Sequence, residues 1–405
     1  MLLVQKFLSE HTFGDLERDH GVTISFSKSG HKWSLNYDLL SKDDDPLAQE
    51  CRGLILACED GRSLSGSAKT INGRLNYDDV CPGKTIVLAF PMRRFFNFGQ
   101  SAAAKIDFSD PETVVQVKAD GSLCIIYVDP FIATWCCATR SCPDADIIMD
   151  NGLFTFGTLF EKALFDKEGT TFAVFCSMLD PNNTYCFELM TNLNKIVVDY
   201  KENNIIFLMA RNNSTLEEVP LDEITGSFDL IGEIDFNDYD KIVEYINSFP
   251  ASEMEGVVVK DKFNNRVKIK SNNYVLAHRM KDHVSASPRN CMDVILSEQD
   301  DDVLPLLPKE IADNLLKMKD NVRRAIKDYD LYYEILLNSA NTISPGDKKT
   351  FALMVTANKQ IWSAPLFQRF LNKASSMKDF VRKNKKNGSF PDSFLDKMLE
   401  ISNQS

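Results

Sequence analysis

The sequence predicts an α+β protein, in which a mainly antiparallel β core is followed by an all-helical C-terminal domain. Between residues 84 and 271, short runs rich in β-branched and aromatic residues are separated by Asn, Asp, Gly and Pro, a pattern typical of many short strands. From Met292 to Ser405, apolar residues instead recur at steps of three and four, which indicates amphipathic helices. We therefore expect two domains, residues 1–285 and residues 292–405.

The elements follow one another in a clear order. Residues 1–60 mix helical and strand signals. The runs after them predict strands at residues 84–90, 113–128, 132–140, 171–176, 184–190, 195–200, 204–212, 255–261 and 266–271. Two helices are expected among these strands, at Phe154–Asp166 and Tyr239–Ser248. Pro345–Gly346, Pro365 and Gly388–Pro391 predict breaks between the C-terminal helices.

Composition limits the class of protein. The 405 residues are 44% hydrophobic, enough for a substantial core, and carry a net charge of −12. Such a charge argues against a general nucleic-acid coat protein, although an enzyme with a local basic cleft remains open. No apolar run reaches the roughly 18 residues that span a bilayer, and the N-terminus lacks the features of a secretory signal. We expect a soluble, monomeric, cytoplasmic or otherwise intracellular protein without a membrane partner.

The cysteines and histidines do not predict a zinc site. Ten cysteines and five histidines are present, but the cluster Cys136, Cys137 and Cys142 contains no CxxC pair and has no histidine nearby. Structural zinc needs four such ligands at defined spacings. Reduced thiols, mostly in apolar segments, are the better interpretation.

The segment Lys118-Ala119-Asp120-Gly121-Ser122 is the central chemical feature. It lies between two apolar runs, Val114–Val117 and Leu123–Val128. A lysine at a strand end can reach a phosphate, and the adjacent glycine lets the backbone approach closely. Alone, the KxDG pattern is weak, because an exposed lysine in a solvated hairpin turn would look the same.

Three further elements follow in order. Glu188 lies between apolar neighbours in a predicted strand, where a carboxylate needs either a partner or solvent. Glu255 and Gly256 precede an apolar strand, and Lys268 and Lys270 share one face of the next by the period of two. Each element alone could belong to a solvated sheet face, since edge lysines are common. The ordered set is much harder to explain that way.

This ordered set resembles the covalent nucleotidyltransferase superfamily of ligases and capping enzymes. More closely, it resembles the phage tRNA-repair RNA ligase 1 family over roughly residues 45–280. Ser122 after KxDG is typical of RNA ligases, and Glu50-Cys51-Arg52-Gly53-Leu54, Pro91–Asn97 and Asn194–Val198 match further family elements. Two positions depart from it, since Arg94 and Arg140 stand where the family has lysine. Arginine and lysine hold phosphates differently.

The resemblance implies a fold and a chemistry. The core is expected to be an adenylyltransferase domain in which Lys118 attacks the α-phosphorus of ATP, forming lysyl-AMP and then an RNA adenylate. Lys268 and Lys270 are expected to assist this catalysis. Further residues are expected to bind the nucleotide: Arg52, Arg94, Val117, Asp120, Gly121, Arg140, Glu188, Val198 and Glu255. Asp120, Glu188 and Glu255 are expected to hold Mg²⁺, or Mn²⁺ in its place, through the waters of the ion, because both ions prefer oxygen donors. The resemblance gives contact with the ribose as the alternative role of Glu188.

The implied partner is RNA with 5′-phosphate and 3′-hydroxyl ends, with nicked tRNA as the expected form and a separate kinase-phosphatase that prepares the ends. An mRNA guanylyltransferase and an ATP-dependent DNA ligase are alternatives, disfavoured by residues 50–54 and 91–97 and by Ser122. A non-catalytic RNA-binding protein on a ligase fold is the alternative from another class. Incubation with α-labelled ATP or GTP separates these functions.

The helical domain yields a prediction of its own. It lies beyond the last motif and carries a basic run, Lys378, Arg382, Lys383, Lys385 and Lys386, which can hold an RNA backbone or simply end a solvated helix. If it is an RNA-specificity module, deleting the chain from about Met292 leaves the AMP label on Lys118 largely intact. Ligation of a structured, nicked RNA then falls more than ligation of a short single strand. Lys383→Glu with Lys386→Glu should weaken ligation of the structured RNA in a salt-dependent way. Equal loss on both substrates, or no loss, would mean that the domain is only a structural support.

Overall fold

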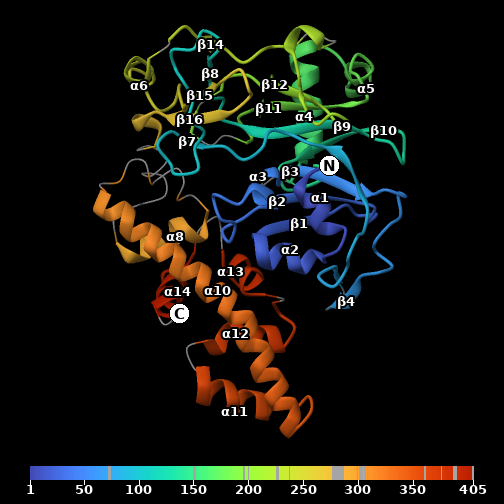
Figure 1. Ribbon diagram of the computed structural model, residues 1–405, viewed down its shortest axis with the longest axis vertical. Coiled ribbons are helices and arrows are strands. Elements are labelled where there is room, and N and C mark those ends of the chain that lie inside the picture. The colour runs from blue at the N-terminus through green and yellow to red at the C-terminus, as the bar shows by residue number, and fades with distance from the viewer. Residues whose placement is uncertain are drawn as a thin grey trace. The chain divides into compact units, whose positions relative to one another are not determined.

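The computed structural model describes residues 1–71, 74–148, 152–194, 197–198, 200–224, 228–236, 238–275, 287–298, 300, 304, 307, 309–359, 362–374, 376–385 and 390–403. The chain divides into two compact units (Figure 1). The first holds Met1–Lys69 with Asn76–Lys281, and the second holds Thr70–Leu75 with Asp282–Ser405. The predicted domain end at residue 285 lies outside the described residues and stays a prediction.

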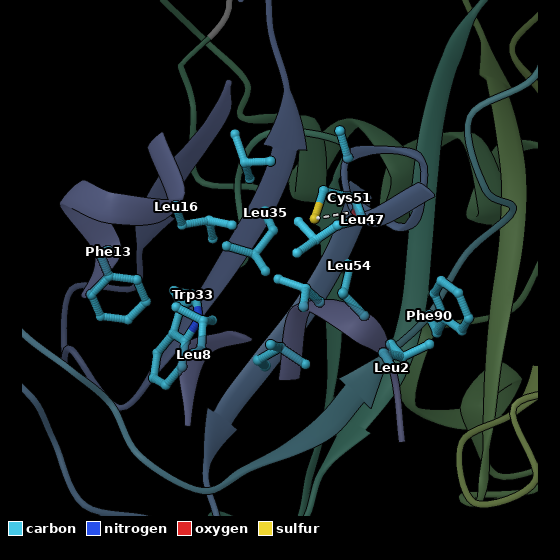
Figure 2. Close-up of a cluster of buried hydrophobic side chains, with 14 of the residues drawn as sticks. Leu2, Leu8, Phe13, Leu16, Trp33, Leu35, Leu47, Cys51, Leu54 and Phe90 are labelled. Carbon is cyan, nitrogen blue, oxygen red and sulfur yellow. Dashed lines mark hydrogen bonds between the residues drawn. The ribbon is translucent and has the colours of Figure 1, made fainter. Parts of the chain in front are cut away.

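An N-terminal sheet of four antiparallel strands runs in the order β1-β2-β3-β6. The strands are β1 (Val22–Phe26), β2 (Lys32–Tyr37), β3 (Arg52–Cys58) and β6 (Thr85–Ala89), and they pack with helices α1 (Leu3–Leu8), α2 (Phe13–His20) and α3 (Pro46–Glu50). Thr12 caps α2 by accepting a hydrogen bond from the Asp15 N–H, and Gly21 ends it in the left-handed conformation. In Figure 2, Leu16 of α2 and Leu35 of β2 belong to one buried cluster. Alternating helices and strands explain the mixed signals of residues 1–60.

A second, five-stranded antiparallel sheet runs in the order β10-β9-β11-β12-β13. Its strands are β9 (Ser122–Asp129), β10 (Thr134–Thr139), β11 (Asn183–Met190), β12 (Asn204–Asn212) and β13 (Glu218–Val219), followed by the 3₁₀ turn η1 (Leu221–Glu223). Helices α4 (Phe156–Glu168) and α5 (Phe172–Cys176) pack on this sheet through Phe160 and Phe175. Ile125 and Tyr127 of β9 pack instead with Ile55 of the N-terminal sheet, so the second sheet is buried on two sides.

A third sheet carries most of the predicted site. Its order is β14-β8-β15-β16-β7, with β14 (Glu233–Ile234), β8 (Val114–Val117), β15 (Gly256–Lys260), β16 (Arg266–Lys270) and β7 (Phe96–Asn97). All pairs are antiparallel except β16 with β7. Helix α6 (Tyr239–Asn247) packs Ile242 and Ile246 against the buried valines of β15. A separate pair, β4 (Lys69–Ile71) with β5 (Arg74–Asn76), completes the strands.

The helices of the second unit are α8 (Pro288–Leu296), α10 (Lys309–Ile343), α11 (Lys348–Lys359), α12 (Ser363–Phe370), α13 (Met377–Asn384) and α14 (Asp392–Asn403). The predicted breaks at Pro345–Gly346 and Gly388–Pro391 coincide with helix ends, although residues 386–389 lie outside the described part. In the basic run, Arg382 and Lys383 both pair with Asp379, so their charge is partly neutralised. No described helix combines the length and the apolar character that crossing a membrane requires.

The predicted α+β class is confirmed, and both helices expected within the core are present as α4 and α6. Two assignments were wrong. Residues 171–176 form α5 instead of a strand, because Thr171 caps the segment and Phe175 turns into the core formed with α4. Pro365 lies in the first turn of α12 instead of between helices, where a proline costs no hydrogen bond. In the predicted strand 195–200, Lys195, Ile196 and Asp199 are outside the described residues.

Candidate functional site

Lys118 stands at the end of β8, where three strands meet. Its backbone N–H donates to the Gly256 carbonyl at 2.9 Å, which ties the loop to the start of β15. Its Nζ donates to Glu255 Oε2 at 2.7 Å, and Lys270 Nζ lies 2.9 Å from the other oxygen, Oε1. The register explains this meeting, since β15 pairs with both β8 and β16 and places Gly256 opposite Lys270. One carboxylate therefore joins two of the predicted catalytic lysines.

Glu255 remains charged in this arrangement. It is only 3% exposed, and burial alone would raise the pKa of its carboxyl. The ion pairs with Lys118 and Lys270 outweigh burial, so the pKa of Glu255 lies below its ordinary value. The buried carboxylate is thus anionic at neutral pH and holds both ammonium groups in place.

Asp120 organises the loop. It is buried, and its Oδ2 accepts hydrogen bonds from the N–H groups of Val197 and Val198 at 2.9 and 2.8 Å. Its Oδ1 accepts from the Tyr274 hydroxyl at 2.9 Å, and its backbone N–H donates to the Tyr200 hydroxyl at 2.9 Å. Asp120 thereby joins three segments that are far apart in the sequence.

Gly121 must be a glycine for a steric reason. A Cβ at this position would lie 2.3 Å from the Leu189 carbonyl oxygen of β11, which is closer than any side chain tolerates. The close approach holds the KxDG loop against the second sheet and brings Lys118 near Glu188, whose pKa it lowers. The glycine of the KxDG pattern is therefore explained by this close backbone contact, which a side chain would block.

Glu188 of β11 is half-buried, and burial raises the pKa of its carboxyl to about 7 even though the charges of Lys118 and Arg52 oppose that rise. Arg52 begins β3, and its guanidinium carbon lies 5.5 Å from the centre of the Phe95 ring. Its buried Nη1 has no hydrogen-bond partner within the described part of the chain. A buried unpaired donor costs free energy, so Arg52 is suited to receive an anionic or polar group from a ligand.

Tyr37 is a residue that the sequence motifs did not identify. Burial raises the pKa of its hydroxyl, but the nearby charges of Arg140, Arg52, Lys268 and Arg94 lower it overall. The guanidinium carbons of Arg94 and Arg140 lie 4.3 and 5.4 Å from its ring centre. Four cations from separate segments therefore gather around one phenol, although the protein as a whole carries a net charge of −12.

Two further residues that the sequence assigned to nucleotide binding, Arg94 and Val117, already have neighbours within the protein. Arg94 donates to Asp43 Oδ1 at 2.9 Å and to the Ser41 hydroxyl at 3.2 Å, so its guanidinium already has protein partners. Val117 packs with the apolar cluster of Ala119, Met190 and Ile231, a surface suited to a purine base. Their roles, like that of Val198, stay predictions. Tyr274 and Tyr200, which hold Asp120, carry no motif signal of their own.

The carboxylates do not form a ready metal site. Among the described residues, no three His, Cys, Asp or Glu side chains converge on a point that a cation could occupy. Both oxygens of Asp120 accept protein hydrogen bonds and both oxygens of Glu255 face lysines. Direct coordination by Asp120, Glu188 and Glu255 together therefore does not fit this geometry.

A family model described as RNA ligase matches residues 50–274, more than half of the chain. The chain belongs to this RNA ligase family. A protein of Autographa californica nuclear polyhedrosis virus, named as a bifunctional polynucleotide kinase/RNA ligase, is 28% identical over 295 residues. The match covers 68% of this chain and 37% of the viral protein, so the chain spans little more than a third of that relative.

Solved structures are more distant. An archaeal ATP-dependent RNA ligase, form 2, has 14% identity and a TM-score of 0.41 over 98% of this chain and 96% of its own. A Naegleria gruberi RNA ligase mutant with ATP and Mn has 14% identity and a TM-score of 0.29, covering 41% of this chain and 52% of its own.

The raised pKa of Glu188 predicts a pH-dependent stability. The carboxyl has an ordinary pKa of 4.5 when unfolded and about 7 when folded, so between these values the folded state holds a proton that the unfolded state has lost. The free energy of unfolding must fall as pH rises through this window, by up to about 3 kcal/mol, and level off above it. Urea unfolding from pH 4.5 to 8 should show this fall in the wild type and a smaller one in Glu188→Gln. Parallel curves for the two proteins would contradict the assignment.

Proposed function

We propose that this chain is an ATP-dependent RNA ligase, which joins an RNA 3′-hydroxyl to a 5′-phosphate through lysyl-AMP and RNA-adenylate intermediates. The observation that carries the proposal is the ion-pair chain Lys118–Glu255–Lys270, with separations of 2.7 and 2.9 Å. Membership of the RNA ligase family supports it. A lysine nucleophile beside a second cation and a buried carboxylate is an arrangement suited to covalent catalysis.

In the first step, Lys118 Nζ attacks the α-phosphorus of ATP. The ammonium form of Lys118 first gives up one proton to the solvent, so that the neutral amine can attack. A P–N bond then forms, the bond to the pyrophosphate leaving group breaks, and the nitrogen loses a second proton. Glu255 Oε2 lies within hydrogen-bond distance of Lys118 Nζ and can accept that proton. Lys270 stays close to the reacting centre and stabilises the charge that develops on the phosphate oxygens.

The next two steps use the same cations. The 5′-phosphate of the RNA attacks the lysyl-AMP, which releases Lys118 and forms a 5′–5′ pyrophosphate linkage. The RNA 3′-hydroxyl then attacks the RNA phosphate, AMP leaves, and a phosphodiester forms. Arg52, with its unpaired Nη1, is suited to hold a phosphate oxygen during these transfers.

The nucleotide is proposed to be ATP, with its base against the cluster of Val117, Ala119, Met190 and Ile231. A divalent cation, Mg²⁺ or Mn²⁺, would neutralise phosphate charge when bound. Because the carboxylates do not converge, such an ion would be held mainly by phosphate oxygens and water, as Mg²⁺ commonly is.

The proposed biological substrate is broken RNA, with nicked tRNA as the expected form. A ligase of this type needs a 5′-phosphate and a 3′-hydroxyl, which many nucleases do not leave. The viral relative is named as a bifunctional polynucleotide kinase/RNA ligase, which supports a polynucleotide kinase as the partner activity that prepares the ends.

Lys118 variants test the nucleophile. Lys118→Ala and Lys118→Arg should both reduce the covalent label from α-labelled ATP to background, because neither can form the phosphoramidate. Lys118→Arg retains a cation beside Glu255, so its urea midpoint should match the wild type, and Lys162→Ala on the exposed face of α4 is the matched control. A label that persists in both variants, AMP on another lysine by mass spectrometry, or a label from GTP instead of ATP would contradict the proposal.

Lys270 and Lys268 variants test transition-state stabilisation. Lys270→Ala removes a charge that faces the reacting phosphate and should slow lysyl-AMP formation by about 10²–10³-fold. Lys268→Ala should slow the same step, since both lysines lie on one face of β16. Rapid-quench measurement of the labelled fraction gives the rate, and a wild-type rate for Lys270→Ala would remove it from the mechanism.

A further inference from the structure

A cavity lies in the first unit, and neither Lys118, Glu255 nor Lys270 lines it. Its volume is about 560 Å³, within the range of ligand-binding pockets. Five segments line it: the end of α3, the stretch that leads into β7, the segment after β7, the chain from β12 to β13, and the tip of the β15–β16 hairpin. Its lining includes three arginines and two phenylalanines that could contact a ligand: Arg93, Arg211, Arg266, Phe95 and Phe263.

The cavity has an excess of positive charge. Arg211 Nη2 and Arg266 Nη1 both donate to Glu218 Oε1, at 3.1 and 2.6 Å, so two buried guanidinium groups share one carboxylate. The pKa of Arg211 is lowered, first by burial and further by the charges of Arg266 and Arg93. Glu217 also lines the cavity but is solvent-exposed. An anion placed here would relieve the repulsion among the arginines.

Arg211 also presents an unused donor. The residue is 8% exposed, and its buried Nε has no hydrogen-bond partner within the described residues. Leaving such a donor unpaired costs about 1–3 kcal/mol.

The cavity connects to the lysine site through β16. Arg266, Lys268 and Lys270 alternate along this strand and share one face, about 6.6 Å apart from one to the next. Lys270 pairs with Glu255, Lys268 lies 5.7 Å from the centre of the Phe95 ring, and Arg266 lines the cavity. The row of cations therefore leads from the reacting phosphate into the cavity.

The rim of the cavity carries an exposed aromatic ring. Phe263, at the hairpin tip, is 74% exposed. An aromatic side chain beside a row of cations is the combination by which proteins hold single-stranded nucleic acid, because bases stack on the ring while phosphates contact the cations.

We propose that this cavity binds the single-stranded RNA end next to the adenylated lysine, with phosphodiesters on Arg266, Arg211 and Arg93 and a base stacked on Phe263. This assignment rests on the proposed ligase function. Arg93 is the accessible cation of the group, since its side chain is 56% exposed, although its Nη2 also lies 3.5 Å from Oε1 of the buried Glu50. Through Arg93 the site can be tested without removing the ion pairs of Glu218.

The test measures RNA binding directly. A fluorescent single-stranded RNA of ten nucleotides with a 5′-phosphate is titrated with full-length protein, first without ATP and then with protein carrying AMP on Lys118. Phe263→Ala should raise the Kd about tenfold, and Arg93→Ala should raise it and lower the salt slope by about one. Phe165→Ala and Arg18→Ala, at side chains of similar exposure away from the cavity, are the matched controls and should bind like the wild type.

The outcomes separate the cavity from the catalytic proposal. Unchanged RNA affinity in both variants, or losses equal to those of the two controls, would overturn the cavity assignment. A raised KM for ATP with unchanged RNA affinity would also overturn it, because the cavity would then serve the triphosphate. The titration without ATP needs no catalysis, so it tests the cavity even if the enzyme is inactive. A wild-type protein that never forms lysyl-AMP would contradict the ligase proposal, and the RNA affinities of the variants would still test the cavity assignment.

Discussion

The site depends on one buried carboxylate held between two lysines. Glu255 is almost removed from solvent, and a buried charge of this kind persists only when opposite charges compensate it. Lys118 and Lys270 supply that compensation from strands on either side of β15. The pairing keeps Glu255 ionised and holds Lys118 and a second cation at the same carboxylate.

The loop around this ion-pair chain is fixed by hydrogen bonds more than by apolar packing. Asp120 uses both carboxylate oxygens to join the backbone of Val197 and Val198 to the Tyr274 hydroxyl. The aspartate of the KxDG pattern therefore supports the loop that carries Lys118.

Local charge and global charge have opposite signs in this protein. The chain carries a net charge of −12, yet Arg52, Arg94, Arg140 and Lys268 surround Tyr37, and Arg93, Arg211 and Arg266 line the neighbouring cavity. Fields inside a cleft depend on nearby groups, because salt screens distant charges within about 10 Å. A net negative charge can therefore coexist with a local cluster of cations.

The sequence by itself determined the α+β class, the family resemblance and the set of charged residues in the core motifs, because each depends on residues close together in the chain. Lys118 and Gly121 belong to one short loop, and Lys268 and Lys270 share a face through the period of two along one strand. Only the tertiary structure decided that Glu255 would join Lys118 to Lys270, that Tyr274 would hold Asp120, and that Arg94 would already be engaged by Asp43. These pairs are separated by between 15 and 154 positions along the chain or by whole strands. The register between strands sets their meeting, and neither local propensity nor composition encodes it. The cavity lined by Arg93, Arg211 and Phe263 could not be predicted from the sequence for the same reason. These residues belong to three segments that lie far apart in the chain and form one site only after the strands have paired.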